Sequence, residues 1–205
     1  MTTPASHDPT ILPDSLPEPA DDGAAGHLPG MVMPALALPA TSGGTFRVDQ
    51  VPEGFRRLVI YAYPMTGRPG VALPEGWDQI PGARGCTPES CGFRDHAAEI
   101  GAAGAAVAGL STQDTGYQRE AADRLRLPFP LLSDAGREFT RALRLPTFEV
   151  EGATLLKRLT LVLRRGTDGR AVVERVFYPV FPPDKHADQV LGWLRSHPVA
   201  REDAG

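Results

Sequence analysis

Two continuous apolar runs constrain the fold of this chain more than any other feature. Residues 58–63 (LVIYAY) and 105–111 (AAVAGLS) are apolar at nearly every position, which is typical of strands buried on both faces. Segments with helical spacing lie between and after them. This alternation predicts an α/β fold in which a mixed central β-sheet carries helices on both faces.

The rest of the pattern supplies the other elements of that sheet. Residues 156–165 and 171–178 are predicted to be strands joined at Asp168-Gly169, a dipeptide that strongly favours a hairpin turn. The other expected elements are helices at 86–100, 116–125, 135–143 and 184–197 and a short strand at 129–134. Residues 64–84 are rich in Gly and Pro and are predicted to form a long loop.

The N-terminal 26 residues differ in composition from the rest of the chain. They carry five acids, five prolines and no Lys or Arg, so they bury little apolar surface and are predicted to be disordered. The expected domain then spans residues 27–198, followed by a short tail at 199–205. The net charge of −4 is concentrated in the N-terminal segment, and without a basic stripe we expect no nucleic-acid partner.

The sequence also gives an expectation for the compartment. The longest apolar stretch, residues 31–40, is broken by prolines and predicts no membrane span. The first residues show no basic region followed by an apolar run, so we expect no export and a cytoplasmic location. In that compartment two cysteines are expected to be free or redox-active.

Both cysteines of the chain lie in GCTPESCGFRD, residues 85–95. Three interpretations fit two thiols this close. A structural zinc site needs about four ligands, and only His96 lies nearby as a third. Two inert core cysteines are a second interpretation. Redox chemistry is the third, and it agrees best with a position at a predicted helix start.

The redox interpretation has a physical basis in the helix. At its N-terminus, unpaired N–H groups and the helix dipole favour a thiolate at Cys86. Cys91 lies five residues on, roughly 7.5 Å along the axis and about 140° around it. A disulfide needs Cα atoms within about 7 Å. A Cys86–Cys91 bond therefore requires the first turns of the helix to unwind.

This segment closely resembles the active-site segment of peroxiredoxins of the bacterioferritin-comigratory-protein (Q) type. The shared residues are AYP at 62–64, Cys86-Thr87, Cys91 and GFRD at 92–95. The similarity continues in GLSTQD at 109–114, FPLLSD at 129–134, Arg158 and the C-terminal helix, so it covers roughly residues 27–198.

The resemblance implies a thioredoxin-like fold and thiol-dependent reduction of hydrogen peroxide or organic hydroperoxides, without a metal or other cofactor. It implies that Cys86 becomes a sulfenic acid, that Cys91 condenses with it, and that thioredoxin or a similar dithiol reduces the disulfide. It assigns Arg158 to lowering the thiol pKa and polarising the peroxide, and Glu89 to orienting that arginine. We expect a monomer or weak homodimer that binds no membrane.

One departure from the family pattern concerns the residues before Cys86. The family motif begins at a proline, here Pro64, and carries a peroxide-binding threonine three residues before the cysteine, where this chain has Ala83. The span from Pro64 to Cys86 is also longer than in the family motif, and a long loop in a compact domain is usually functional. Thr66 is the candidate for the missing hydroxyl, and Trp77 either covers the site or packs against the domain.

Two alternative functions stay open at this point. The missing threonine and the long loop suit a redox sensor or interaction module that is switched by helix unwinding. A specialised disulfide oxidoreductase in a biosynthetic pathway is the other alternative.

Overall fold

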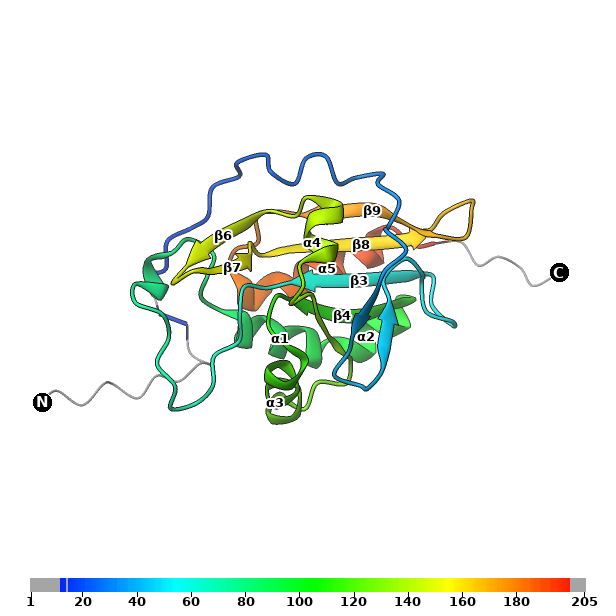
Figure 1. Ribbon diagram of the computed structural model, residues 1–205. Coiled ribbons are helices and arrows are strands. Elements are labelled where there is room, and N and C mark those ends of the chain that lie inside the picture. The colour runs from blue at the N-terminus through cyan, green and yellow to red at the C-terminus, as the bar shows by residue number, and fades with distance from the viewer. Residues whose placement is uncertain (1–11, 14, 200–205) are drawn as a thin grey trace, which may run out of the picture.

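A mixed five-stranded sheet lies at the centre of the computed structural model, which describes residues 12–13 and 15–199 (Figure 1). Its strands are β3 (Arg57–Ala62), β4 (Ala105–Ser111), β5 (Leu131–Ser133), β8 (Leu159–Arg165) and β9 (Ala171–Phe177). Their spatial order is β5-β4-β3-β8-β9. β3, β4 and β5 run parallel, whereas β8 is antiparallel to both β3 and β9. This is the predicted thioredoxin-like arrangement, with both apolar runs inside the sheet.

The continuous apolar character of β3 follows from the burial of both its faces. Leu58 and Ile60 belong to the hydrophobic cluster on one face, and Val59 and Tyr61 to the cluster on the other. Successive side chains of a strand point to opposite faces, so a strand covered on both sides has no polar face. All six residues of β3 are buried.

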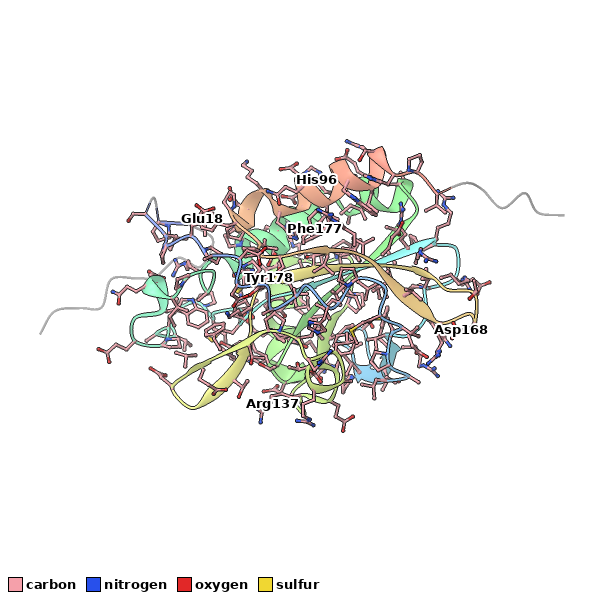
Figure 2. The ribbon with its side chains drawn as sticks, turned by 90° about the horizontal axis from the view of Figure 1, so that it is seen from above. Glu18, His96, Arg137, Asp168, Phe177 and Tyr178 are labelled. Atoms are coloured by element: carbon pink, nitrogen blue, oxygen red, sulfur yellow. The ribbon has the colours of Figure 1, made fainter. Side chains whose placement is uncertain are left out.

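Helices cover both faces of the sheet, as predicted. One hydrophobic cluster receives residues from α1 (Cys86–Asp95), α2 (Ala97–Ala102), α3 (Thr115–Leu125) and α5 (His186–Ser196). The other receives residues from α4 (Glu138–Leu143) and β1 (Ala37–Pro39), which pairs with β2 (Thr45–Arg47). Figures 1 and 2 show α4 and α5 on opposite sides of the sheet. No helix among the described residues is long and apolar enough to cross a membrane.

The helix predicted over residues 86–100 is divided into α1 and α2. The chain turns at His96 (φ −97°, ψ 5°), where the ring nitrogens lie 3.0 Å from a Glu99 oxygen and 2.9 Å from an Asp188 oxygen. A turn of a single residue leaves the spacing of the apolar side chains almost unchanged. Periodicity therefore did not reveal the break.

The sequence analysis also missed the hairpin formed by β6 (Thr147–Val150) and β7 (Ala153–Leu156). Its two turn residues, Glu151 and Gly152, have φ angles of 47° and 77°. Turns with two positive φ angles favour Asn-Gly or Asp-Gly, and the glutamate concealed this one. The hairpin lies beside the loop of residues 64–84, at the end of the molecule opposite the β8–β9 turn (Figure 1).

Part of the N-terminal segment predicted to be disordered lies against the domain. Asp22 pairs with Lys157 Nζ at 2.6 Å and accepts a hydrogen bond of 2.6 Å from the Tyr178 hydroxyl, while Ala25 is buried. For residues 12–13 and 15–26 the structure therefore differs from the prediction, because partners far along the chain supply contacts that composition does not reveal. The prediction for residues 1–11 and 14 lies outside the described residues.

Candidate active site

Cys86 is the first residue of α1 and is buried, with 4% of its surface exposed. The preceding Gly85 has a φ of 104°, and a Cβ there would lie 2.3 Å from Pro183 Cγ, so glycine is required. No side chain caps this helix, which leaves backbone N–H groups of the first turn beside the thiol. Such groups and the helix dipole favour negative charge on the sulfur.

Arg158 lies against Cys86, as the family resemblance implied. It stands between β7 and β8, and its Nη2 is 3.2 Å from Cys86 Sγ. The same nitrogen is 3.3 Å from the carbonyl oxygen of Ala83 and 3.2 Å from that of Arg84. The guanidinium is thus held by the loop that leads into α1, and it places a buried positive charge at the sulfur.

Glu89 lies on the far side of the same guanidinium and forms a buried ion pair with Arg158 Nη1. It comes from the first turn of α1, and none of its surface is exposed. Within the described residues its Oε1 has no hydrogen-bond partner. The structure therefore brings together three predicted site residues, Cys86, Glu89 and Arg158, with the arginine in the middle.

Burial and charge act in opposite directions on this group. Burial raises the pKa of the Cys86 thiol and Glu89 adds to the rise, whereas the Arg158 charge and hydrogen bond lower it. Burial also raises the pKa of Glu89 to about 7, against the effect of Arg158. Burial alone would lower the pKa of Arg158, but its two negative neighbours raise it, so the guanidinium stays charged at any physiological pH.

The loop before Cys86 contributes backbone atoms where the family motif has a hydroxyl. The Ala83 methyl is fully buried, and its carbonyl accepts a hydrogen bond from the Cys86 thiol at 3.6 Å. The Met65 backbone also hydrogen-bonds the sulfur and lowers the thiol pKa. The main chain between β3 and α1 therefore contacts the Cys86 sulfur at two residues, Met65 and Ala83.

Thr66, the candidate for the missing hydroxyl, is bonded elsewhere. It is fully buried, and its Oγ1 and its backbone N–H both donate to Gln113 Oε1, at 3.2 and 2.9 Å. Gln113 Nε2 donates back to the Thr66 carbonyl at 3.2 Å. Neither Thr66 nor the buried Pro64 lines the pocket at Cys86. A role for these two residues in binding peroxide stays a prediction that this geometry does not support.

Cys91 has different surroundings. It is half-buried on α1, and both cysteines are free thiols. Burial raises the pKa of the Cys91 thiol, while the charge of Arg94 lowers it. Cys86 and Cys91 both belong to the continuous helix α1, so the predicted disulfide cannot form in this conformation.

A small pocket reaches Cys86 beneath the long loop. It is lined by residues of the loop and of the first turn of α1, namely Met65, Gly67, Leu73, Trp77, Arg84, Gly85, Cys86 and Thr87. The volume open to the centre of a water molecule is about 20 Å³, slightly more than one water requires. The sequence leaves open whether Trp77 covers the site or packs against the domain. In the structure Trp77 does both, because it lines this pocket and is buried in a hydrophobic cluster.

The donor set offers no place for a metal. Within residues 12–13 and 15–199 no group of three or more His, Cys, Asp or Glu side chains could hold an ion.

Comparisons with known proteins agree with this geometry. The family model described as Redoxin matches residues 28–191. The chain is 32% identical to the chloroplastic peroxiredoxin Q of Populus jackii, over 82% of this chain and 68% of that protein. It is also 32% identical to the chloroplastic peroxiredoxin Q of Gentiana triflora, over 90% and 76%.

Solved structures give the same result. The peroxidoxin BcpB of Mycobacterium tuberculosis superposes with a TM-score of 0.60 at 28% identity, covering 83% of this chain and 98% of that one. The bacterioferritin comigratory protein of Xanthomonas campestris, studied for its alkyl peroxide reduction activity, has a TM-score of 0.58 at 25% identity and coverages of 82% and 97%.

Proposed function

The chain belongs to the Redoxin family and is a thiol peroxidase of the peroxiredoxin type, and we propose that it reduces hydrogen peroxide or organic hydroperoxides through Cys86. The observation that carries this mechanism is the contact of 3.2 Å between Arg158 Nη2 and a buried sulfur at a helix N-terminus. A thiolate there is stabilised by the guanidinium and the helix dipole together.

In the first step the Cys86 thiolate attacks one oxygen of the peroxide. An S–O bond forms as the O–O bond breaks, and the departing alkoxide or hydroxide takes up a proton. The sulfur is oxidised to a sulfenic acid and the peroxide is reduced to an alcohol or water. Arg158 stabilises the negative charge as it moves from sulfur to oxygen, and Glu89 positions Arg158 through their ion pair.

In the second step α1 unwinds at its N-terminal end and the Cys91 thiol attacks the Cys86 sulfenic acid. The S–S bond forms and one water leaves. A dithiol reductant of the thioredoxin type then reduces the disulfide by exchange, becomes oxidised itself and restores both thiols. The half-buried position of Cys91 supports this order, because Cys91 lies outside the pocket that holds Cys86.

We propose that residues 27–198 form the catalytic domain and that the protein acts as a monomer or weak homodimer without a nucleic-acid or membrane partner. We also propose a cytoplasmic location, although the plant relatives are named chloroplastic.

The mechanism is tested by pairing the two cysteine variants. Wild-type protein should consume hydrogen peroxide continuously with thioredoxin, thioredoxin reductase and NADPH, and mass spectrometry should find a Cys86–Cys91 disulfide after oxidation. Cys86→Ser should abolish consumption. Cys91→Ser should still reduce about one equivalent of peroxide, form no internal disulfide and fail to turn over with thioredoxin.

Retained turnover in Cys86→Ser would refute the assignment of the reactive thiol. Normal turnover in Cys91→Ser would refute the resolving role of Cys91. Oxidation of Cys86 without turnover in the wild type would instead favour a redox sensor.

A further inference from the structure

The loop between β3 and α1 forms a roof over Cys86. Two of its residues, Leu73 and Trp77, line the small pocket that reaches the sulfur. Met65 and Gly67 line its near side, and a Cβ on Gly67 would lie 3.1 Å from Leu73 Cδ2. The pocket is therefore closed on one side by residues that belong to the part of the loop longer than in the family motif.

This roof is fixed by packing. Trp77 begins the short 3₁₀ turn η1 (Trp77–Gln79) and has only 4% of its surface exposed. It belongs to a separate hydrophobic cluster with Ala83 and Leu155, and its ring lies 6.3 Å from that of Phe148. Leu155 and Phe148 come from the β6–β7 hairpin, so the hairpin packs against the roof, and Figure 1 shows the hairpin beside this loop.

A second, larger pocket lies nearby but does not reach the thiol. Its volume in the same measure is about 370 Å³, and its lining includes Ile80, Pro81, Tyr178 and the predicted site residue Arg158, but not Cys86. Tyr178, labelled in Figure 2, directly follows the edge strand β9. The loop thus lines both pockets, with Leu73 and Trp77 on the small one and Ile80 and Pro81 on the large one. A bulky substrate held in this larger apolar pocket would therefore not contact the Cys86 sulfur.

The size of the small pocket then limits which peroxide reaches Cys86. A cavity must offer about 10–15 Å³ to the centre of a probe to hold one water, so about 20 Å³ suits a molecule little larger than water. Hydrogen peroxide has two heavy atoms and fits such a space. A hydroperoxide with a branched or aromatic group must displace Leu73 or Trp77, and buried side chains pack too densely to yield without cost.

We propose that Leu73 and Trp77 set the substrate range of this peroxidase by restricting the Cys86 pocket to hydrogen peroxide and excluding bulky organic hydroperoxides. This inference rests on the proposed function and narrows its substrate class. It concerns the chain's own loop, and it sets the protein apart from the Xanthomonas campestris relative that was studied for alkyl peroxide reduction.

The test compares rate constants for Cys86 oxidation by hydrogen peroxide and by cumene hydroperoxide, followed by rapid quenching and mass spectrometry. The wild type should favour hydrogen peroxide by about tenfold or more, and Leu73→Ala and Trp77→Ala should each reduce that preference by about tenfold. The change should arise from faster reaction with cumene hydroperoxide. Val71→Ala is the matched control, since Val71 is in the same loop, is 52% exposed and does not line the pocket.

Leu73→Ala is the safer variant, because Trp77 also supports the fold of the loop. Comparable rates with both peroxides in the wild type would overturn the inference and leave the proposed function intact. An unchanged preference in a folded Leu73→Ala protein would do the same. Failure of both peroxides to oxidise Cys86 would overturn the proposed function, and this inference with it.

Discussion

Helix α1 carries two thiols in different surroundings, one at its N-terminal end and one near its middle. Cys86 is buried at the N-terminal end and touches a buried guanidinium, whereas Cys91 is half-buried five residues later beside Arg94. Burial raises the pKa of both thiols. The surroundings that distinguish Cys86 are the small pocket, the helix N-terminus and the position of Arg158.

This difference explains how two similar thiols can divide a reaction between them. In the proposed mechanism the first thiol needs a preorganised positive charge, because charge moves from sulfur to oxygen in the step that it performs. The second thiol needs only to come within reach of the Cys86 sulfenic acid, since a sulfenic acid reacts readily with a thiol. In that mechanism the intact helix α1 keeps the two thiols apart until the first step is complete.

The largest expected effect comes from removing the charge that distinguishes Cys86. Arg158→Met should lower the rate constant of Cys86 with hydrogen peroxide on the order of 100-fold. The loss of positive charge should also move the midpoint of the pH–rate profile upward, because Arg158 lowers the thiol pKa. Stopped-flow measurements across pH check both effects.

Arg94→Met is the matched control for that variant. Arg94 lowers the pKa of Cys91, and its removal should leave the rate at Cys86 unchanged. Equal losses in the two variants would show that net charge, and not the geometry at Cys86, controls the reaction.

A smaller effect should come from stiffening α1 next to Cys91. Gly92 lies within α1, and an added Cβ would meet Ala187 Cβ at 3.4 Å, an ordinary contact. Gly92→Ala should stabilise the helix by up to about 1 kcal/mol and slow disulfide formation about fivefold. Oxidation of Cys86 to the sulfenic acid should keep its rate, as time-resolved quenching and mass spectrometry can show.

Gly101→Ala in α2 serves as the control, because an added Cβ there meets nothing within 4 Å and lies outside the segment that must unwind. It should change neither step. If Gly92→Ala also left disulfide formation unchanged, unwinding of α1 would not limit the second step.

The smallest expected effect concerns the carboxyl behind the guanidinium. Ionised Glu89 raises the pKa of Cys86, so Glu89→Gln should lower that pKa by up to about one unit. The pKa of Glu89 itself is about 7, so the wild-type carboxyl is already neutral well below pH 7. The variant should therefore differ from the wild type in peroxide reactivity only above about pH 7. Thiol titration in that range compares the pKa of Cys86 in the two proteins. An equal difference in peroxide reactivity between the two proteins at pH 5 would contradict the assignment of charge to Glu89.

Local signals in the sequence predicted the reactive end of α1 well. The run of apolar residues in β3, the glycine at 85 and the helix start at Cys86 all depend on neighbours within a few residues, and the structure confirms each of these elements. The family resemblance added Arg158, which lies 72 residues beyond Cys86 in the chain, and the structure places its guanidinium at the sulfur.

Contacts between distant segments were beyond such signals. Thr66 is the sequence's candidate for the pocket hydroxyl because it follows Pro64, but its hydroxyl bonds to Gln113, 47 residues away. Trp77 had two open roles because nothing near it in the sequence reveals the β6–β7 hairpin that holds it. The composition of the acidic N-terminal segment predicts disorder, yet Asp22 accepts hydrogen bonds from Lys157 and Tyr178.

The sequence by itself determined the sheet, the helix that carries both thiols and their separation along it, because backbone geometry and side-chain periodicity act over short distances. Only the tertiary structure decided which charge lies beside Cys86, where the hydroxyl of Thr66 points and how small the pocket over the sulfur is. Those properties depend on which distant segments pack together, and packing is set by the fit of many side chains at once.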